Sequence, residues 1–189
     1  MDMRAPRRWT GAVFIGVSLD GYVARPDGDL DWLTTPSPRG HVAAAPTTPA
    51  LVWETFFPTV DAVVMGRATY ETVLGFDEWA FEGKTVVVLS TTLRTDDPRV
   101  AVATSVEQAR RLLDRNGAGR VYVDGGRTIQ SFLTAGLVDE LTVSIAPVLI
   151  GHGKRLFGDL DRDVLLTLRG THATPEDGLV RVTYTVSTA

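Results

Sequence analysis

The stretch VYVDGGRT, residues 121–128, decides the fold class of this chain. Its first three residues are apolar without alternation, which indicates a strand covered on both faces of a sheet. Two glycines follow, and the next residues predict a helix from Thr128 to Ala135 that ends at Gly136. A buried strand, a short turn and a helix form the repeating unit of α/β domains. The stretch therefore predicts a layered α/β fold.

Strand patterns on both sides of this stretch extend the predicted sheet. The central runs are apolar throughout, whereas the last two are longer and more polar, which indicates an antiparallel hairpin at one edge and hence a mixed sheet. The predicted strands are Val13–Val17, Ala62–Met65, Thr85–Leu89, Val100–Ala103, Val121–Val123, Leu141–Ala146, Leu165–Leu168 and Leu179–Val186.

Helical patterns lie between these strands. The clearest runs from Ser105 to Arg115, where Ser105 and Gln108 can form a capping box. Shorter helices are predicted over Leu51–Phe57 and Thr69–Leu74. The one long irregular segment, 25–49, has the length and composition of a lid or binding loop. We expect a short N-terminal tail over residues 1–11 and a single domain over 12–189.

Composition excludes several classes of function. The 189 residues carry 19 Lys and Arg against 23 Asp and Glu, a net charge of −4, so no basic excess favours nucleic acid. The absence of cysteine excludes disulfides, thiol nucleophiles and Cys-ligated metals, and three scattered histidines predict no metal site. No apolar run reaches the roughly 20 residues that cross a bilayer, and no leader pattern is present. We expect a cytoplasmic protein that does not bind membranes.

A first candidate for anion binding is GRATYE, residues 66–71, which directly follows the predicted strand Ala62–Met65. Free backbone N–H groups at such a helix start attract anions, and Arg67 adds a positive charge. The alternative is a helix N-cap at Thr69 beside a surface arginine.

Two further strand ends carry similar features. The glycines at 125 and 126 let a ligand or another backbone approach closely, although a plain glycine turn is the alternative, and the pattern is not G-x-G-x-x-G. Ser90 and Thr91 offer hydroxyl groups where another strand ends, at the edge where ligands of open α/β sheets bind. Three such ends along one edge suit an extended bis-phosphate such as a dinucleotide.

The segments VVMGRATYE, TVVVLSTT and VYVDGGRTIQSFLTAGLVDELTVSIAPVLIGHG, together with VSLDGYVA, resemble the dihydrofolate-reductase-like fold. More specifically, they resemble the C-terminal reductase domain of the bacterial riboflavin-biosynthesis deaminase/reductase and its stand-alone relatives. The resemblance runs from about Ala12 to Thr185. It implies a three-layer α/β domain with a central mixed eight-stranded sheet, NADPH as cofactor, and a homodimer.

The resemblance also implies roles for particular residues. Three groups of residues would hold the cofactor. Its phosphates would be bound by Gly66, Arg67 and Thr69, and the adenosine 2′-phosphate would lie by Ser90 and Thr91. The pyrophosphate would be cradled by Gly125, Gly126, Arg127 and Thr128. The pocket for substrate and nicotinamide would be walled by Ser18, Asp20, Gly21 and Trp32. The alternatives are a tight turn at Asp20-Gly21 and a core anchor at Trp32.

The sequence does not carry the proton donor of the folate reductases at the expected position. Folate reductases carry a buried carboxylate before the GRATYE strand, but counting back reaches about Ala50, which cannot donate a proton. Glu54 or Asp31, both near aromatic residues, are the candidate substitutes, and the alternative is that both are solvated surface groups. The deaminase's zinc signature is absent, so no deaminase activity is expected.

The expected function is an NADPH-dependent reductase that transfers hydride to a C=N or C=O bond of a small heterocycle. The closest family activity is that of 5-amino-6-(5-phosphoribosylamino)uracil reductase in riboflavin biosynthesis. The alternatives are a dihydrofolate or pterin-type reductase and a nucleotide-binding module without turnover, because a fold does not by itself set a function.

Overall fold

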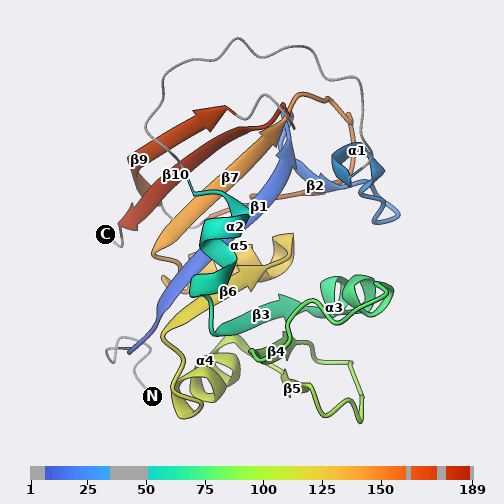
Figure 1. Cartoon of the computed structure of the whole chain (residues 1–189), viewed down its shortest axis with the longest axis vertical. Coiled ribbons are helices and arrows are strands. Elements are labelled where there is room, and N and C mark those ends of the chain that lie inside the picture. The colour runs from blue at the N-terminus through green and yellow to red at the C-terminus, as the bar shows by residue number, and fades with distance from the viewer. Residues whose placement is uncertain (1–6, 35–50, 161–162, 174–177, 188–189) are drawn as a thin grey trace.

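The structure is a computed structural model, and it describes residues 7–34, 51–160, 163–173 and 178–187 (Figure 1). An eight-stranded sheet forms its centre, in the order β5-β4-β3-β6-β1-β7-β10-β9. Its strands are β1 (Thr10–Ser18), β3 (Ala62–Gly66), β4 (Thr85–Leu89), β5 (Val100–Ala103), β6 (Arg120–Asp124), β7 (Glu140–Ala146), β9 (Leu165–Ala173) and β10 (Val180–Ser187).

The sheet is mixed, as the sequence predicts. The six strands from β5 to β7 run parallel to their neighbours, whereas β10 pairs antiparallel with both β7 and β9. The last two strands therefore form the predicted hairpin at one edge. Because β4, β3 and β6 are adjacent and parallel, their carboxyl ends meet at the same edge of the sheet.

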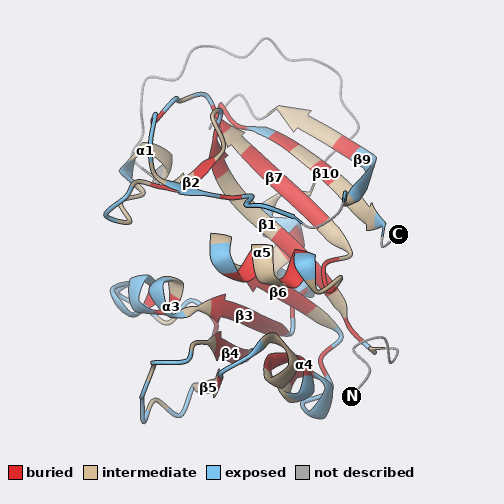
Figure 2. Cartoon of the chain, turned by 180° about the vertical axis from the view of Figure 1, so that it is seen from behind, coloured by how far each residue is buried: buried red, intermediate tan, exposed pale blue. Residues whose placement is uncertain are grey.

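Helices cover both faces of the sheet and make the domain three layers deep (Figures 1 and 2). On one face, α4 (Val106–Arg115) and α5 (Gly126–Thr134) bury Leu113 and Phe132 against the sheet. On the other, α2 (Trp53–Phe56) and α3 (Arg67–Leu74) bury Phe56 and Tyr70. Burial of apolar side chains on both faces explains why the central strands carry no alternation.

The helices confirm one sequence prediction in detail and correct others. The Ser105 hydroxyl accepts a hydrogen bond from the Gln108 N–H at 3.1 Å, so the predicted cap of α4 is present. The helix α5 begins at Gly126, two residues before the predicted start. The predicted helix over Leu51–Phe57 is only α2, and a 3-10 turn over Phe57–Thr59 follows because Pro58 cannot continue an α-helix.

Two short strands that the sequence did not predict form a second sheet, in which β2 (Tyr22–Ala24) pairs with β8 (Lys154–Arg155). Runs of three and two residues are too short for a periodic pattern. The segment predicted to be irregular contains a short helix, α1 (Asp31–Thr34), while its residues 35–49 lie outside the described residues, as does Ala50. Within the described ranges, every helix is too short or too polar to cross a bilayer.

Candidate active site

Two helices begin at the carboxyl edge of the sheet without a side-chain cap among the described residues. The N-cap of α3 is Gly66 and that of α5 is Gly125, in contrast to Ser105 at α4. The alternative of an N-cap at Thr69 is therefore wrong, because α3 already begins at Arg67. Uncapped first-turn N–H groups and the helix dipole favour an anion at both positions.

These two helix starts lie against each other. A Cβ added to Gly125 would come 2.4 Å from Thr69 Oγ1, and one added to Gly66 would come 3.1 Å from Thr128 Oγ1. Gly125 also has a φ of 85°, which side chains other than glycine rarely adopt. The glycines therefore let the ends of β3 and β6 approach closely enough to present both sets of N–H groups to one ligand.

Gly126 lies against another part of the chain, and its role in binding a pyrophosphate stays a prediction. A Cβ at this position would lie 3.1 Å from the carbonyl oxygen of Arg155 and 3.1 Å from Val23 Cγ2. The small β2–β8 sheet therefore packs on this side of Gly126, so its backbone and side chains leave no room for a side chain at this position. Any contact of Gly126 with a cofactor is through its backbone.

Arg67 connects the start of α3 with the end of β4. Its Nε donates to Glu71 Oε1 at 2.6 Å, and its Nη1 donates to Thr92 Oγ1 at 3.2 Å, with half of the side chain exposed. Ser90 Oγ accepts the N–H groups of Thr92 and Leu93 at 3.3 and 3.0 Å, so it holds the turn in place. An exposed guanidinium beside hydroxyl groups is an arrangement that can bind a phosphate.

Asp124 ends β6 directly before the two glycines and is partly exposed at the same edge. Its Oδ1 accepts the Gly125 N–H at 2.8 Å. Burial raises the pKa of Asp124 above the ordinary value of 3.8, although the Tyr122 hydroxyl and the Gly125 N–H oppose the shift. Burial, followed by the Asp124 charge, also raises the pKa of Tyr122. A carboxyl whose neutral form is favoured can act as a general acid.

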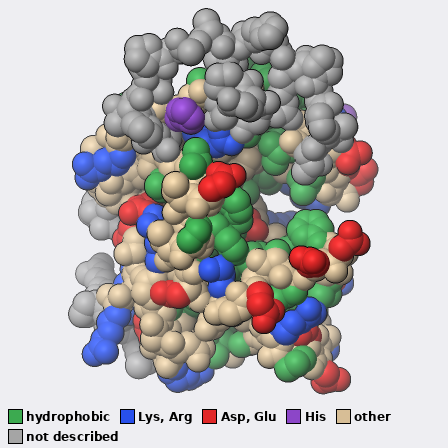
Figure 3. Space-filling view, in the orientation of Figure 1, with side chains coloured by type: hydrophobic (Ala, Val, Ile, Leu, Met, Phe, Trp, Pro, Cys, Tyr) green, Lys and Arg blue, Asp and Glu red, His purple; other side chains and the backbone are tan. Residues whose placement is uncertain are grey.

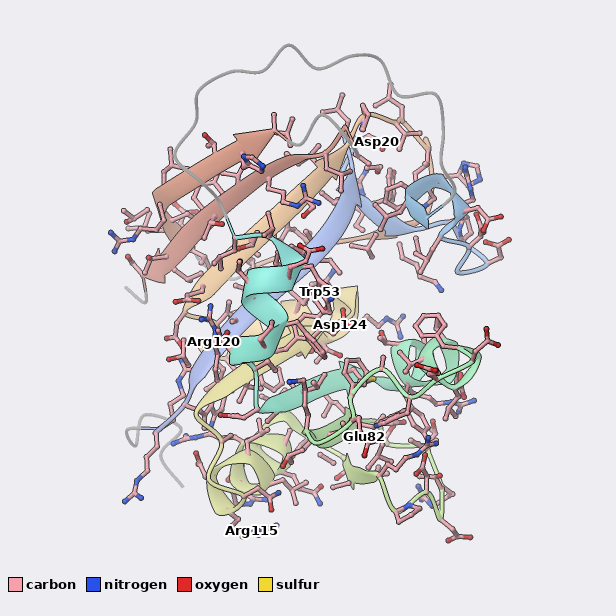
Figure 4. All side chains as sticks on the ribbon, in the orientation of Figure 1. Asp20, Trp53, Glu82, Arg115, Arg120 and Asp124 are labelled. Carbon is pink, nitrogen blue, oxygen red and sulfur yellow. The ribbon has the colours of Figure 1, made fainter. Side chains whose placement is uncertain are left out.

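An aromatic cluster lies beside Asp124. Trp53 of α2 packs edge-on against Tyr122 and Phe14, with ring centroids 5.6 and 5.5 Å apart, and remains 37% exposed. Figure 4 labels Trp53 and Asp124 in the same region, between α2 and β6. The surface is hollowed nearby, between the part that carries α1 and β2 and the part that carries α3 (Figure 3). An exposed aromatic face next to an acid suits a flat heterocycle.

Comparison with known proteins places the chain in a family. The family model described as the RibD C-terminal domain matches residues 10–180. The chain belongs to the RibD C-terminal domain family. The uncharacterized protein YwjB of Bacillus subtilis is 29% identical over 163 residues, which cover 84% of this chain and 88% of YwjB.

Two solved structures resemble this chain. A protein of Shewanella sp. PV-4 assigned to riboflavin biosynthesis is 33% identical, with a TM-score of 0.79 and coverage of 95% of this chain and 99% of that one. Dihydrofolate reductase of Enterococcus faecalis complexed with NADP(H) has a TM-score of 0.62 at 16% identity, covering 95% and 96% of the two chains. The dihydrofolate-reductase-like fold expected from the sequence is confirmed.

In this RibD C-terminal domain, Asp20 and Ser18 are engaged with the protein itself. Ser18 Oγ donates to Asp20 Oδ1 at 2.6 Å, and the Gly151 N–H donates to Oδ2 at 2.8 Å. The Ser18 hydrogen bond is the main reason that the pKa of Asp20 is lowered. Gly21 closes a tight turn with a φ of 88°. This group joins the end of β1 to the loop at Gly151, and a substrate contact by Ser18, Asp20 or Gly21 stays a prediction.

The two carboxyl groups favoured from sequence are both exposed. Glu54 lies on the outer side of α2, and Asp31 begins α1. Trp32 in α1 is partly exposed, and its indole nitrogen is buried. The sequence analysis of this RibD C-terminal domain did not select Asp124 or Trp53 as candidate site residues. The signal for Asp124 was present, since a carboxylate that directly ends an apolar strand before paired glycines must lie at the ligand edge.

Proposed function

We propose that this chain is an NADPH-dependent reductase that acts on a C=N or C=O bond of a small heterocycle, of the kind reduced in riboflavin biosynthesis. The observation that carries the proposal is the position of Asp124, a carboxyl with a raised pKa at the point where two uncapped helix starts meet. The family match and the fold shared with an NADP(H)-bound dihydrofolate reductase support the choice of cofactor.

The described residues fit a phosphorylated dinucleotide. The N–H groups at the starts of α3 and α5 would hold its pyrophosphate, and Arg67 with Thr92 would meet the 2′-phosphate. When bound, the reduced nicotinamide would supply the hydride. Trp53 would orient the substrate ring by stacking and exclude water from one side.

Asp124 would supply the proton. Because its Oδ1 accepts the Gly125 N–H, Oδ2 is the oxygen that would carry the proton toward the nitrogen or oxygen of the reduced bond. Hydride addition to carbon and protonation of the heteroatom together balance the reduction.

The direct test is to mix the protein with NADPH and a panel of oxo-pyrimidines, dihydrofolate and pterins and to follow the absorbance of the reduced nicotinamide. Oxidation only with an oxo-pyrimidine supports the proposal. Oxidation only with dihydrofolate favours the pterin-type alternative, and NADPH binding without oxidation of any compound favours a nucleotide-binding module.

We also propose that the chain forms a homodimer through β9. Leu165, Leu166 and Leu168 are 60%, 43% and 57% exposed on this edge strand, which has no outer neighbour among the described strands. Figure 2 shows β9 at the edge of the sheet, beyond β10. Exposed apolar edge strands are rare in monomers because they pair with other chains, and a second copy is a partner that closes such an edge by two-fold symmetry.

Sedimentation analysis should therefore show a dimer, and Leu166→Lys with Leu168→Lys should convert it to a monomer that remains folded. A matched control is Leu74→Lys, which changes a leucine of similar exposure, 45%, at the end of α3. A wild-type monomer, or a dimer that survives both lysine substitutions, would contradict this interface.

A further inference from the structure

A buried tyrosine precedes Asp124 by two residues on β6, and the proposed reaction does not use it. Tyr122 is 6% exposed, and its ring packs edge-on against Phe56 and Trp53, with centroids 5.5 and 5.6 Å apart. Packing accounts for the ring but not for the hydroxyl, because a phenylalanine would fill the same space without a polar atom that needs a partner. The hydroxyl of Tyr122 therefore needs an explanation of its own.

The Tyr122 hydroxyl reaches the level of Asp124 along the sheet. It donates a hydrogen bond to the carbonyl oxygen of Phe14 at 3.1 Å. Tyr122 itself pairs with Ala12 on β1, so its side chain leans two residues toward the carboxyl edge. Continuing this parallel register by two residues brings Asp124 beside Phe14, and Asp124 faces the same side as Tyr122 because alternate residues of a strand do. The hydroxyl therefore lies where the Phe14 carbonyl and the Asp124 carboxyl meet.

The hydroxyl has one proton and two acceptors. Besides the Phe14 carbonyl, the ionised Asp124 carboxyl can accept it, and this hydrogen bond opposes the rise that burial causes in the pKa of Asp124. Burial also raises the pKa of Tyr122 well above its ordinary value, so the hydroxyl keeps its proton. A carboxylate accepts a hydrogen bond more strongly than a carbonyl or a neutral carboxyl does. The donor therefore belongs with Phe14 while Asp124 is neutral and with Asp124 once that group is ionised.

The pKa of Asp124 responds to no charged side chain of the described residues. Burial raises it, and the Tyr122 hydroxyl and the Gly125 N–H lower it. The neighbouring strands bring apolar side chains to this position, and the nearby helices keep their charges in solvent. These neighbours are Met65 on β3, Phe14 on β1, Glu54 on α2, Arg67 on α3 and Arg127 on α5. Tyr122 is thus the side chain that sets how strongly Asp124 holds its proton.

We propose that Tyr122 is a positioning residue for the proton transfer: its hydroxyl passes its hydrogen bond from the Phe14 carbonyl to Asp124 as that carboxyl gives up its proton. The proton of the carboxyl goes to the substrate, and Tyr122 keeps its own. The new hydrogen bond stabilises the carboxylate that remains on the protein, so buried Asp124 is a stronger acid than burial alone would make it. This inference rests on the proposed function, in which Asp124 is the proton donor.

The direct test is a carbon NMR titration of the ligand-free protein with isotope-labelled aspartate, in which Asp124→Asn assigns the Asp124 signal. Tyr122→Phe removes only the hydroxyl and should move the Asp124 midpoint to higher pH, because the ionised carboxyl has lost a donor. The matched control is Tyr70→Phe, which removes the hydroxyl that another buried tyrosine donates to Asp97 at 2.9 Å. It should leave the Asp124 midpoint unchanged. An unchanged or lower midpoint in Tyr122→Phe would overturn the inference.

The pH profile of turnover gives a second readout that a merely structural tyrosine would not move. At low pH, where Asp124 is protonated in both proteins, Tyr122→Phe should slow the reaction by about 3–10-fold, because a weaker acid transfers its proton more slowly. The loss should shrink as pH rises, because the weaker acid stays protonated to higher pH. A loss by the same factor at every pH would mean that Tyr122 acts only through packing, and the inference would fail.

These outcomes are separable from those of the proposed function. The NMR titration needs neither cofactor nor turnover, so an unchanged midpoint overturns the inference even in a protein that oxidises NADPH. Conversely, a midpoint that moves to higher pH in a protein that reduces no ring compound would overturn the reductase proposal and leave the hydrogen-bond exchange between Tyr122 and Asp124 standing.

Discussion

The variant Asp124→Asn is expected to lose about 10²–10⁴-fold in turnover while its affinity for NADPH stays nearly unchanged. The amide keeps the shape of the carboxyl but cannot donate the proton, and general acid catalysis is typically worth this factor. The measurement is steady-state oxidation of NADPH beside direct titration with the cofactor. Glu54→Gln and Asp31→Asn are the matched comparisons, since sequence reasoning favours those two carboxyl groups, and a larger loss in either of them would contradict the role of Asp124.

The raised pKa of Asp124 adds a pH dependence to this prediction. The neutral acid persists to higher pH than for an ordinary aspartate, and the rate should fall as pH rises through the raised value. The raised pKa also makes the free energy of unfolding depend on pH in the same direction. The stabilising contribution of neutral Asp124 is fully present below its unfolded-state pKa and is lost as pH rises through its folded-state pKa. Asp124→Asn should therefore gain stability relative to the wild type as pH rises, which denaturant melts at several pH values would measure.

Arg67→Ala is expected to weaken NADPH binding by about ten- to hundredfold and NADH binding much less. The 2′-phosphate adds negative charge that the guanidinium meets, and hydrogen bonds to charged groups contribute about 1.5–3 kcal/mol. Because half of the Arg67 side chain is exposed, the loss should shrink as salt rises. Fluorescence titrations with both cofactors at two ionic strengths would measure it.

A matched control for this prediction lies on α4. Arg111 pairs with Glu107 at 2.6 Å, four residues apart like Arg67 and Glu71 but in the reverse order, on a helix whose start carries a serine cap. Arg111→Ala should leave both affinities unchanged. Equal losses of NADPH and NADH in Arg67→Ala would instead assign Arg67 to the pyrophosphate that the two cofactors share.

Much of the fold follows from local patterns in the chain. Apolar runs such as Thr85–Leu89 and Val100–Ala103 are strands with the predicted bounds. The Ser105 hydroxyl caps α4 as predicted, because a cap depends only on residues close in sequence, whereas the Gln108 side chain accepts the Thr104 N–H instead of completing the capping box at Ser105. The polar residues in the last two predicted strands indicate the antiparallel edge hairpin of β9 and β10, because fewer side chains pack on these strands than on the central ones.

Helix starts at the ligand edge are harder to locate from local patterns. Thr69 and Thr128 look like caps in sequence, yet α3 and α5 begin earlier, at Arg67 and Gly126. The reason is tertiary. The threonine hydroxyls instead lie against Gly125 and Gly66 of the neighbouring strand end, a contact between segments about 60 residues apart that no window of sequence contains.

The chemistry of the site depends still more on long-range packing. The sequence contains carboxyl groups at 31, 54 and 124, but only the folded sheet places Asp124 in a partly buried position beside Tyr122 while Glu54 stays in solvent. The hydroxyl that meets Arg67 is that of Thr92 rather than Thr91, because the turn after β4, held by Ser90, sets which side chain faces α3. Local sequence determined where most strands lie along the chain and where α4 begins. The order of the strands in the sheet, and the exposure, pKa and hydrogen-bond partners of the site residues, depend on neighbours in space that only strand pairing and burial bring together.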